Sequence, residues 1–189
     1  PIQLRAKEGL ALINGTQFIL AHAVTGLAKM KYLLNLADVA GAMSVEGFQG
    51  STAPYKKALH TIRPFQGAIK VAERMRGFLK DSQNVLSHQG CGRVQDPFSF
   101  RCIPHIHGAC RDSFMNAAEM VNNEINSVSD NPLIMESGNV VSSGHFHAEH
   151  IAQAMDTLAI AFYHFFDIFS YSKLPPLSFQ LMGEVEEYS

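Results

Sequence analysis

The sequence predicts an all-α protein, built from the long, largely buried helices of a central helical bundle with one small β-hairpin. Two observations support this fold class. Apolar residues recur at helical spacing along most of the 189-residue chain, as they do in helices that bury at least one face. One short stretch alone has the pattern of two paired strands.

Four long helices are expected. The spacing of apolar residues places them at residues 18–48, 64–79, 103–126 and 147–171. Pro64 suits the first turn of the second helix, where a missing backbone N–H costs nothing. In the first and last helices apolar residues occupy more than one face. We therefore expect these two helices to pack against partners on several sides.

The connections between the helices differ in composition. Residues 81–92 are polar and are expected to form a loop, and Asp130-Asn131-Pro132 should stop the third helix. Glu136-Ser137-Gly138 lies between two short apolar runs and predicts the hairpin. We expect residues 1–172 to form the helical-bundle part, and residues 173–189 to form a divergent tail with an acidic end.

The segment Gln95-Asp96-Pro97-Phe98-Ser99-Phe100-Arg101 precedes the third helix. Pro97 and Pro104 each remove a backbone donor and disfavour helical geometry at the residue before them, which predicts a bent entry into that helix. The planar fork of Arg101 suits carboxylate binding. Taken alone, such a group of polar residues more often forms a turn that satisfies its own hydrogen bonds. Whether the segment binds a carboxylate or only forms a turn, we expect Asp96 and Pro97 to have structural roles.

Composition excludes several partners. The formal net charge is −2 and no basic cluster occurs, so we expect neither nucleic acid nor an anionic membrane as a partner. No run approaches the ~20 apolar residues of a spanning helix. Cys91, Cys102 and Cys110 form no CxxC pair, which is typical of free thiols in a reducing compartment. We therefore expect a cytoplasmic protein.

A metal site is the first alternative for the histidine-rich stretch that contains His145, His147, Glu149 and His150. On a helix, however, only His147 and His150 would share a face, and a metal needs more ligands than two. We therefore expect no metal. The chain also has neither a Gly-x-Ser-x-Gly nucleophile elbow nor a glycine-rich phosphate loop.

Four blocks of sequence carry a resemblance to a known family. They begin at Lys7-Glu8-Gly9, His60-Thr61-Ile62-Arg63-Pro64, Arg93-Val94-Gln95-Asp96-Pro97 and Asn126-Ser127-Val128, the last followed by Gly144-His145-Phe146-His147-Ala148-Glu149. In this order and at this spacing they resemble the aromatic amino-acid ammonia-lyase family. Phe146-His147-Ala148-Glu149 resembles its histidine ammonia-lyase branch, because the phenylalanine enzymes typically have Phe-Gln-Gly there.

The resemblance implies an activity for the full-length protein. Members of the histidine branch eliminate ammonia from L-histidine without oxidation to give urocanate, and they act as homotetramers. Their electrophile is a methylidene-imidazolone (MIO) ring that forms from an Ala-Ser-Gly tripeptide upstream of the block at Lys7. This tripeptide is absent from the sequence, and Ser142-Ser143-Gly144 matches a different family stretch. The 189-residue chain alone is therefore expected to be inactive.

The resemblance also assigns roles to five residues. Asn14 would hydrogen-bond the electrophile and its adduct, and Gln95 would bind near the ring. Arg101 would pair with the carboxylate of a small amino-acid substrate. Phe146 would pack beside substrate and ring. Phe98 occupies the position of the family's catalytic tyrosine.

Three residues depart from the family pattern. Phe98 replaces a tyrosine whose hydroxyl takes part in proton transfer, and a phenyl ring cannot do acid–base chemistry. His145 replaces an asparagine, and His105 replaces the glutamine that is usual in the histidine enzymes. Two alternatives therefore remain open. One is a phenylalanine- or tyrosine-type lyase or aminomutase. The other is a non-catalytic helical oligomerisation module derived from a lyase.

Overall fold

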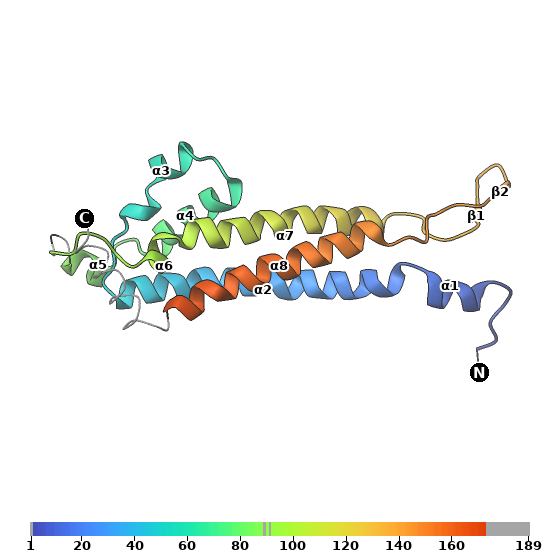
Figure 1. Cartoon of the computed structure of the whole chain (residues 1–189), viewed down its shortest axis with the longest axis horizontal. Helices are drawn as coiled ribbons and strands as arrows, with labels where there is room; N and C mark the ends of the chain where they lie inside the picture. The colour runs from blue at the N-terminus through green and yellow to red at the C-terminus, as the bar shows by residue number, and fades with distance from the viewer. Residues whose placement is uncertain (1, 89, 91, 173–189) are drawn as a thin grey trace, which may run out of the picture. The chain divides into compact units, whose positions relative to one another are not determined.

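The computed structural model describes residues 2–88, 90 and 92–172, and it is predominantly helical (Figure 1). Within this part of the chain, the α-helices are accompanied by one 3₁₀ turn and one two-stranded sheet. The prediction of an all-α protein with a small hairpin is confirmed. Residues 173–189 lie outside the described residues, so the division into a helical part and a tail stays a prediction.

The elements follow one another along the chain with short connections. In order they are α1 (Glu8–Asn14), α2 (Gln17–Gly47), η1 (Ala53–Tyr55), α3 (Lys57–Thr61), α4 (Gln66–Phe78), α5 (Gln83–Ser87), α6 (Phe98–Arg101), α7 (Ile103–Ile125), β1 (Leu133–Ile134), β2 (Val140–Val141) and α8 (Glu149–Ser172). The four predicted long helices correspond to α2, α4, α7 and α8, and each end lies within two residues of its predicted position.

The short helices were not predicted. The expectation of a loop over residues 81–92 is wrong, because α5 forms there. Ser82 caps this helix by accepting a hydrogen bond from the Val85 N–H at 3.3 Å, and burial of the Val85 side chain holds the helix against the core. Pro64 precedes α4 instead of lying in its first turn, since the extended Phe65 is the N-cap.

The helix is interrupted before the third long helix, in the segment where a bent entry was predicted. A four-residue helix, α6, is followed by Cys102 and then by α7. Ile103 is the first residue of α7, as the predicted range 103–126 requires, although a following proline disfavours helical geometry at that position. Pro104 lies in the first turn of α7, where backbone N–H groups have no acceptor within the helix, so the missing N–H of proline costs no hydrogen bond.

The contacts of the chain divide it into two units. The first comprises the chain up to Met30 together with Phe114–Leu158, and the second comprises Lys31–Ser113 with the chain from Ala159 onward. The helices α2, α7 and α8 each contribute residues to both. The first unit contains the hairpin, in which Leu133 pairs with Val141 and Ile134 with Val140. Gly138 turns the hairpin with a φ of 83°, a conformation that favours glycine.

The second unit has a hydrophobic core between α2, α4 and α7. Its buried members are Ala42, Val45, Tyr55, Val71, Met75, Leu79, Val85 and Ile103. Helices α4 and α7 approach closely at two glycines: a Cβ on Gly67 would lie 2.0 Å from the Gly108 carbonyl oxygen. Any larger residue at Gly67 would therefore separate these helices. The N–H of Gly67 also donates to the carboxylate of Asp112 at 2.8 Å.

A fully buried carboxylate, Asp38, ties the same three helices together. It accepts hydrogen bonds from Arg74 of α4 at 2.7 Å and from His107 and Arg111 of α7 at 2.9 and 2.6 Å. Burial by itself would raise the pKa of the Asp38 carboxyl. The His107 hydrogen bond and the Arg111 charge outweigh burial, so the pKa lies below its usual value. We call these four residues the Asp38 cluster.

In the described part of the chain, no single helix is long and apolar enough to cross a bilayer. Only α1 and α2 together, with a bend of 41° at the break between them, reach that length and composition.

Candidate functional site

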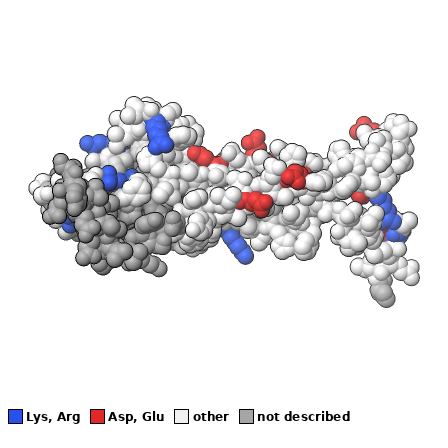
Figure 2. All heavy atoms as spheres, viewed as in Figure 1, with Lys and Arg blue, Asp and Glu red and all other residues white. Residues whose placement is uncertain are grey.

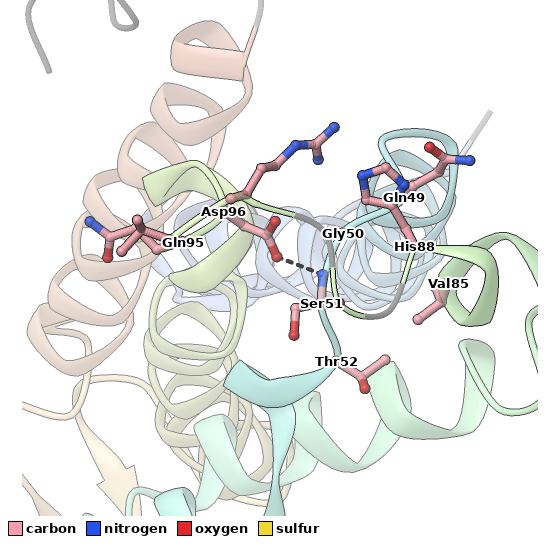
Figure 3. Close-up of a pocket in the computed structure, with 11 residues that line it drawn as sticks. Gln49, Gly50, Ser51, Thr52, Val85, His88, Gln95 and Asp96 are labelled. Carbon is pink, nitrogen blue, oxygen red and sulfur yellow. Dashed lines mark hydrogen bonds between the residues drawn. The ribbon is translucent and has the colours of Figure 1, made fainter. Parts of the chain in front are cut away.

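The Gln95 segment borders a polar cavity in the second unit. The cavity has a volume of about 320 Å³ and lies between this segment, the loop after α2, and α5 and its C-terminal flank (Figure 3). Gln95 and Asp96 line it together with Ser51 and Arg93. The Asp96 carboxylate accepts a hydrogen bond from the Ser51 N–H at 2.6 Å, which fixes the segment against the loop and confirms a structural role for Asp96.

Arg101 is anchored by one nitrogen. Its Nε donates to the carbonyl oxygen of Asp96 at 2.8 Å, and its two terminal nitrogens make no hydrogen bond with another described residue. Those two nitrogens form the edge of the guanidinium that binds a carboxylate through two parallel hydrogen bonds. Arg101 does not line the cavity, and neither does Phe98, whose side chain is 54% exposed.

The short helix α6 is held in place by Phe100 and Tyr55. Phe100 packs against the hydrophobic core of the second unit, and its carbonyl oxygen accepts a hydrogen bond from the Tyr55 hydroxyl at 2.8 Å. Burial, with smaller contributions from Asp96 and Cys102, raises the pKa of Tyr55 well above its ordinary value. The hydroxyl therefore stays protonated and keeps donating, and α6 presents Phe98 and Arg101 from a fixed backbone.

In the first unit, a turn at residues 129–132 holds the helix that carries Asn14. The Lys7 ammonium forms an ion pair with Asp130 at 2.9 Å and donates to the Pro132 carbonyl oxygen at 2.9 Å. On the other side of α1, Gln17 donates to the Ser129 hydroxyl at 3.0 Å. Because α1 lies between these two attachments, the turn determines where Asn14 lies.

The same turn holds the segment that carries Phe146. The Ser143 N–H donates to the Asn131 side-chain oxygen at 2.8 Å, and the Ser143 hydroxyl donates to the Asp130 carbonyl oxygen at 3.1 Å. Ser142 donates to the same Asn131 oxygen at 3.3 Å. Ser142-Ser143-Gly144 therefore fastens the exit of the hairpin to the turn. Phe146 follows it with 40% of its side chain exposed.

The five residues predicted for the site thus fall into two groups. Gln95, Phe98 and Arg101 lie together in the second unit, whereas Asn14 and Phe146 belong to the first. The sequence reasoning did not identify Lys7, Ser129 and Asp130 as the residues that position the first-unit pair. A signal was present, because Lys7 and Asp130 lie in two of the four matching blocks and carry opposite charges.

His105, one of the departures from the family pattern, lines a second cavity. This cavity has a volume of about 300 Å³, and its lining includes Arg63 and Asp112 and shares no residue with the Gln95 cavity. Burial, with smaller effects from His60 and Arg63, lowers the pKa of His105. His145 belongs to the first unit. Among the described residues, no group of three or more His, Cys, Asp or Glu side chains is placed to hold a metal ion.

The described cysteines are free thiols, as predicted. Cys110 donates to the Ala161 carbonyl oxygen at 3.0 Å, and burial raises its pKa to about 11. Cys102 is half-buried, and burial raises its pKa despite the charge of Arg101. Neither thiol is therefore a ready nucleophile at neutral pH. Cys91 lies outside the described residues.

Comparison with known proteins decides the family. The family model for aromatic amino acid lyases matches residues 1–171. The chain belongs to this family. The resemblance carried by the four sequence blocks is thereby confirmed. A histidine ammonia-lyase from Burkholderia multivorans is 48% identical over 162 residues, an alignment that covers 85% of this chain and 32% of that protein.

Solved structures of aromatic amino acid lyases and aminomutases share the fold. A histidine ammonia-lyase from Trypanosoma cruzi matches with a TM-score of 0.76 and 39% identity, covering 89% of this chain and 31% of that one. A phenylalanine aminomutase from Pantoea agglomerans matches with a TM-score of 0.80 and 34% identity, covering 89% and 36%. The chain thus spans about a third of the length of the lyases it matches.

Proposed function

We propose that the full-length protein containing this chain is a histidine ammonia-lyase, which eliminates ammonia from L-histidine to give urocanate. The observation that carries the proposal is the Gln95–Arg101 segment, in which an anchored guanidinium keeps two terminal nitrogens available for a substrate carboxylate. The 48% identity to histidine ammonia-lyases supports L-histidine as the substrate, as does the histidine-branch pattern at Phe146-His147-Ala148-Glu149.

The residues present suit the family's MIO ring. The side-chain amides of Asn14 and Gln95 make no hydrogen bond with another described residue, and amide N–H groups are the donors that ring carbonyls accept. When bound, the ring supplies the electrophile that activates the amino acid for loss of ammonia. Arg101 would orient the substrate through its carboxylate. Phe146 would exclude water from one side of it.

We further propose that this protein works as a cytoplasmic homotetramer. Asn14 follows Leu12 and Ile13 in α1, whose side chains are 70% and 84% exposed. A contiguous exposed apolar patch marks an interaction surface, and a second subunit is the partner that we propose for this one. A partner that covers them would also close the surroundings of Asn14.

The activity itself is the first test. The full-length protein should release ammonia and urocanate from L-histidine. It should release no ammonia from L-phenylalanine or L-tyrosine, the substrates of the alternative enzymes. The 189-residue chain alone should release neither product, because it contains no Ala-Ser-Gly from which the ring can form. Absorbance of urocanate measures the product. Urocanate formed by the purified chain would show that the chemistry lies elsewhere.

Replacing Arg101 with alanine should weaken substrate binding. A hydrogen bond to a charged group contributes roughly 1.5–3 kcal/mol, which corresponds to an increase of about 10- to 150-fold in KM. Arg101→Lys is the matched control, since it keeps the charge but loses the planar fork. Its KM should lie between those of the parent and of Arg101→Ala. Steady-state kinetics with L-histidine measures the effect. An unchanged KM in Arg101→Ala would remove this residue from the site.

A second candidate function is favoured by Phe98. With a phenyl ring at the acid–base position, the protein could persist as a non-catalytic helical module derived from a lyase. The two candidates predict different properties of the full-length protein. The enzyme carries the MIO ring, which absorbs light, and releases ammonia from L-histidine, whereas the module forms its oligomer without either property.

A further inference from the structure

The helix that carries Asn14 has little core of its own. None of the residues described in α1 is buried, and Gly9 and Ala11 are half-buried. Gly15 is extended and separates α1 from α2, and the two helices meet with a bend of 41°. A helix of seven residues is marginal without packing. The position of α1, and with it that of Asn14, therefore depends on polar contacts at its two flanks.

Lys7, the residue immediately before α1, holds one of these flanks. Its ammonium forms the ion pair with the Asp130 carboxylate at 2.9 Å and donates to the Pro132 carbonyl oxygen at 2.9 Å. On the other flank the Thr16 hydroxyl donates to the Ser129 hydroxyl at 3.1 Å. In Figure 2 basic and acidic atoms lie together on the part of the surface that α1 and the hairpin form. Both flanks of α1 are thus attached to the turn at residues 129–132.

The backbone of Lys7 is in the left-handed region, with a φ of 73° and a ψ of −20°. A lysine rarely adopts this conformation, because its Cβ crowds a neighbouring carbonyl oxygen. Such conformations persist where surrounding contacts require them, and they concentrate at functional sites. The Lys7 carbonyl oxygen accepts a hydrogen bond from the Ala11 N–H at 3.0 Å, so this residue also starts α1. The contacts of its ammonium therefore determine the direction in which the helix leaves the turn.

The same turn holds the segment that carries Phe146. The Asn131 side-chain oxygen accepts a hydrogen bond from the Ser143 N–H at 2.8 Å, and the Asp130 carbonyl oxygen accepts one from the Ser143 hydroxyl at 3.1 Å. A hydrogen-bonded turn that begins one residue later contains Phe146. Asp130 thus contacts the α1 flank through its carboxylate and the Phe146 segment through its backbone.

The Lys7–Asp130 ion pair is partly open to water. The two side chains are 38% and 27% exposed, and ion pairs this accessible usually contribute little to stability. Hydrogen bonds from Lys7 and from the Asn131 N–H hold the pKa of Asp130 below its usual value, so the carboxylate is charged at neutral pH. The main effect of the pair is therefore on geometry, since it joins two segments of the candidate site.

We propose that Lys7 and Asp130 are positioning residues for the lyase reaction, and that their ion pair sets Asn14 relative to Phe146. Both act through Asn14, which would hydrogen-bond the ring. This inference rests on the proposed function, from which the roles of Asn14 and Phe146 come. Arg101 is anchored within the second unit, so binding of the substrate carboxylate does not depend on the pair. Loss of the pair should therefore lower kcat and leave KM nearly unchanged.

Replacing Lys7 with methionine in the full-length protein should lower kcat for L-histidine by about 10- to 100-fold, the cost of a small misplacement of a reacting group. KM should stay nearly unchanged, because substrate binding is intact. Lys7→Arg keeps the charge and should retain most of the turnover. Lys70→Met is the matched control, because Lys70 forms an exposed ion pair with Glu73 at 3.0 Å in the second unit, and its kcat should equal that of the parent.

A double variant tests whether the two residues act as one pair. Asp130→Asn keeps an oxygen for the Asn131 N–H and loses the charge that Lys7 contacts. The double variant Lys7→Met/Asp130→Asn should then lose no more kcat than either single variant. Losses that multiply would contradict the pair. A lower midpoint of denaturant unfolding with an unchanged kcat would reduce the pair to a structural role and equally contradict the proposal.

Amide hydrogen exchange tests the positioning without substrate. In Lys7→Met the amides of α1 should exchange faster than in the parent, whereas those of α4 should not. Unchanged exchange in α1 would overturn the proposal, as would an unchanged kcat. A full-length parent that releases no urocanate would refute the proposed function instead, and the exchange of α1 would still decide whether the Lys7 ion pair fixes this helix.

Discussion

Replacing Phe98 with tyrosine in the full-length protein is expected to raise the turnover of L-histidine by about 10²- to 10⁴-fold. The family places a tyrosine hydroxyl at this position for proton transfer, and a phenyl ring offers no exchangeable proton. The side chain of Phe98 is 54% exposed, so a hydroxyl can be added without overpacking the core. The fixed backbone of α6 would hold it beside Arg101.

Steady-state kcat with L-histidine measures this effect. Phe65→Tyr is the matched control, because Phe65 is a similarly exposed phenylalanine at 57% outside the Gln95 segment, and its turnover should not change. A Phe98→Tyr variant that carries the ring chromophore but turns over no faster would mean that another group supplies the proton transfer. If the full-length protein lacks the chromophore altogether, the helical-module alternative is favoured.

Replacing Asp38 with alanine is expected to destabilise the chain by about 3–5 kcal/mol, the usual cost of removing one partner from a buried ion pair. Arg74, His107 and Arg111 would lose the carboxylate that all three contact. Denaturant unfolding followed by circular dichroism measures the change. Asp156→Ala, at an exposed position of α8, is the control and should change stability by no more than about 0.5 kcal/mol.

The Asp38 cluster should also make stability depend on pH in acid. The pKa of Asp38 lies below its ordinary value of 3.8 in the folded chain. Its stabilisation is therefore fully present above that value and is lost as pH falls through the folded-state pKa. A protonated Asp38 resembles asparagine, so the stability difference between the parent and Asp38→Asn should shrink below about pH 4. A difference that stays constant down to acid unfolding would remove Asp38 as the cause.

The sequence by itself determined the helical architecture and the family. Helical periodicity depends on the local order of residues, so α2, α4, α7 and α8 were predictable to within two residues. The four blocks identified the family because long matches at fixed spacing rarely arise by chance. The lack of a CxxC pair among the cysteines predicted free thiols, and Pro97 and Pro104 predicted that the chain would not run straight into α7.

Only the tertiary structure decided which distant residues meet. Nothing in the local pattern distinguishes Asp38 from a solvated aspartate, because its burial depends on Arg74 and Arg111, which lie far along the chain. The turn at residues 129–132 likewise positions other segments only because the folded chain brings Lys7 and Ser143 within hydrogen-bond distance of it. Position 67 likewise requires glycine because Gly108 of another helix approaches it closely. Periodicity records which face of a helix is apolar, whereas the identity of its partner depends on how the whole chain folds.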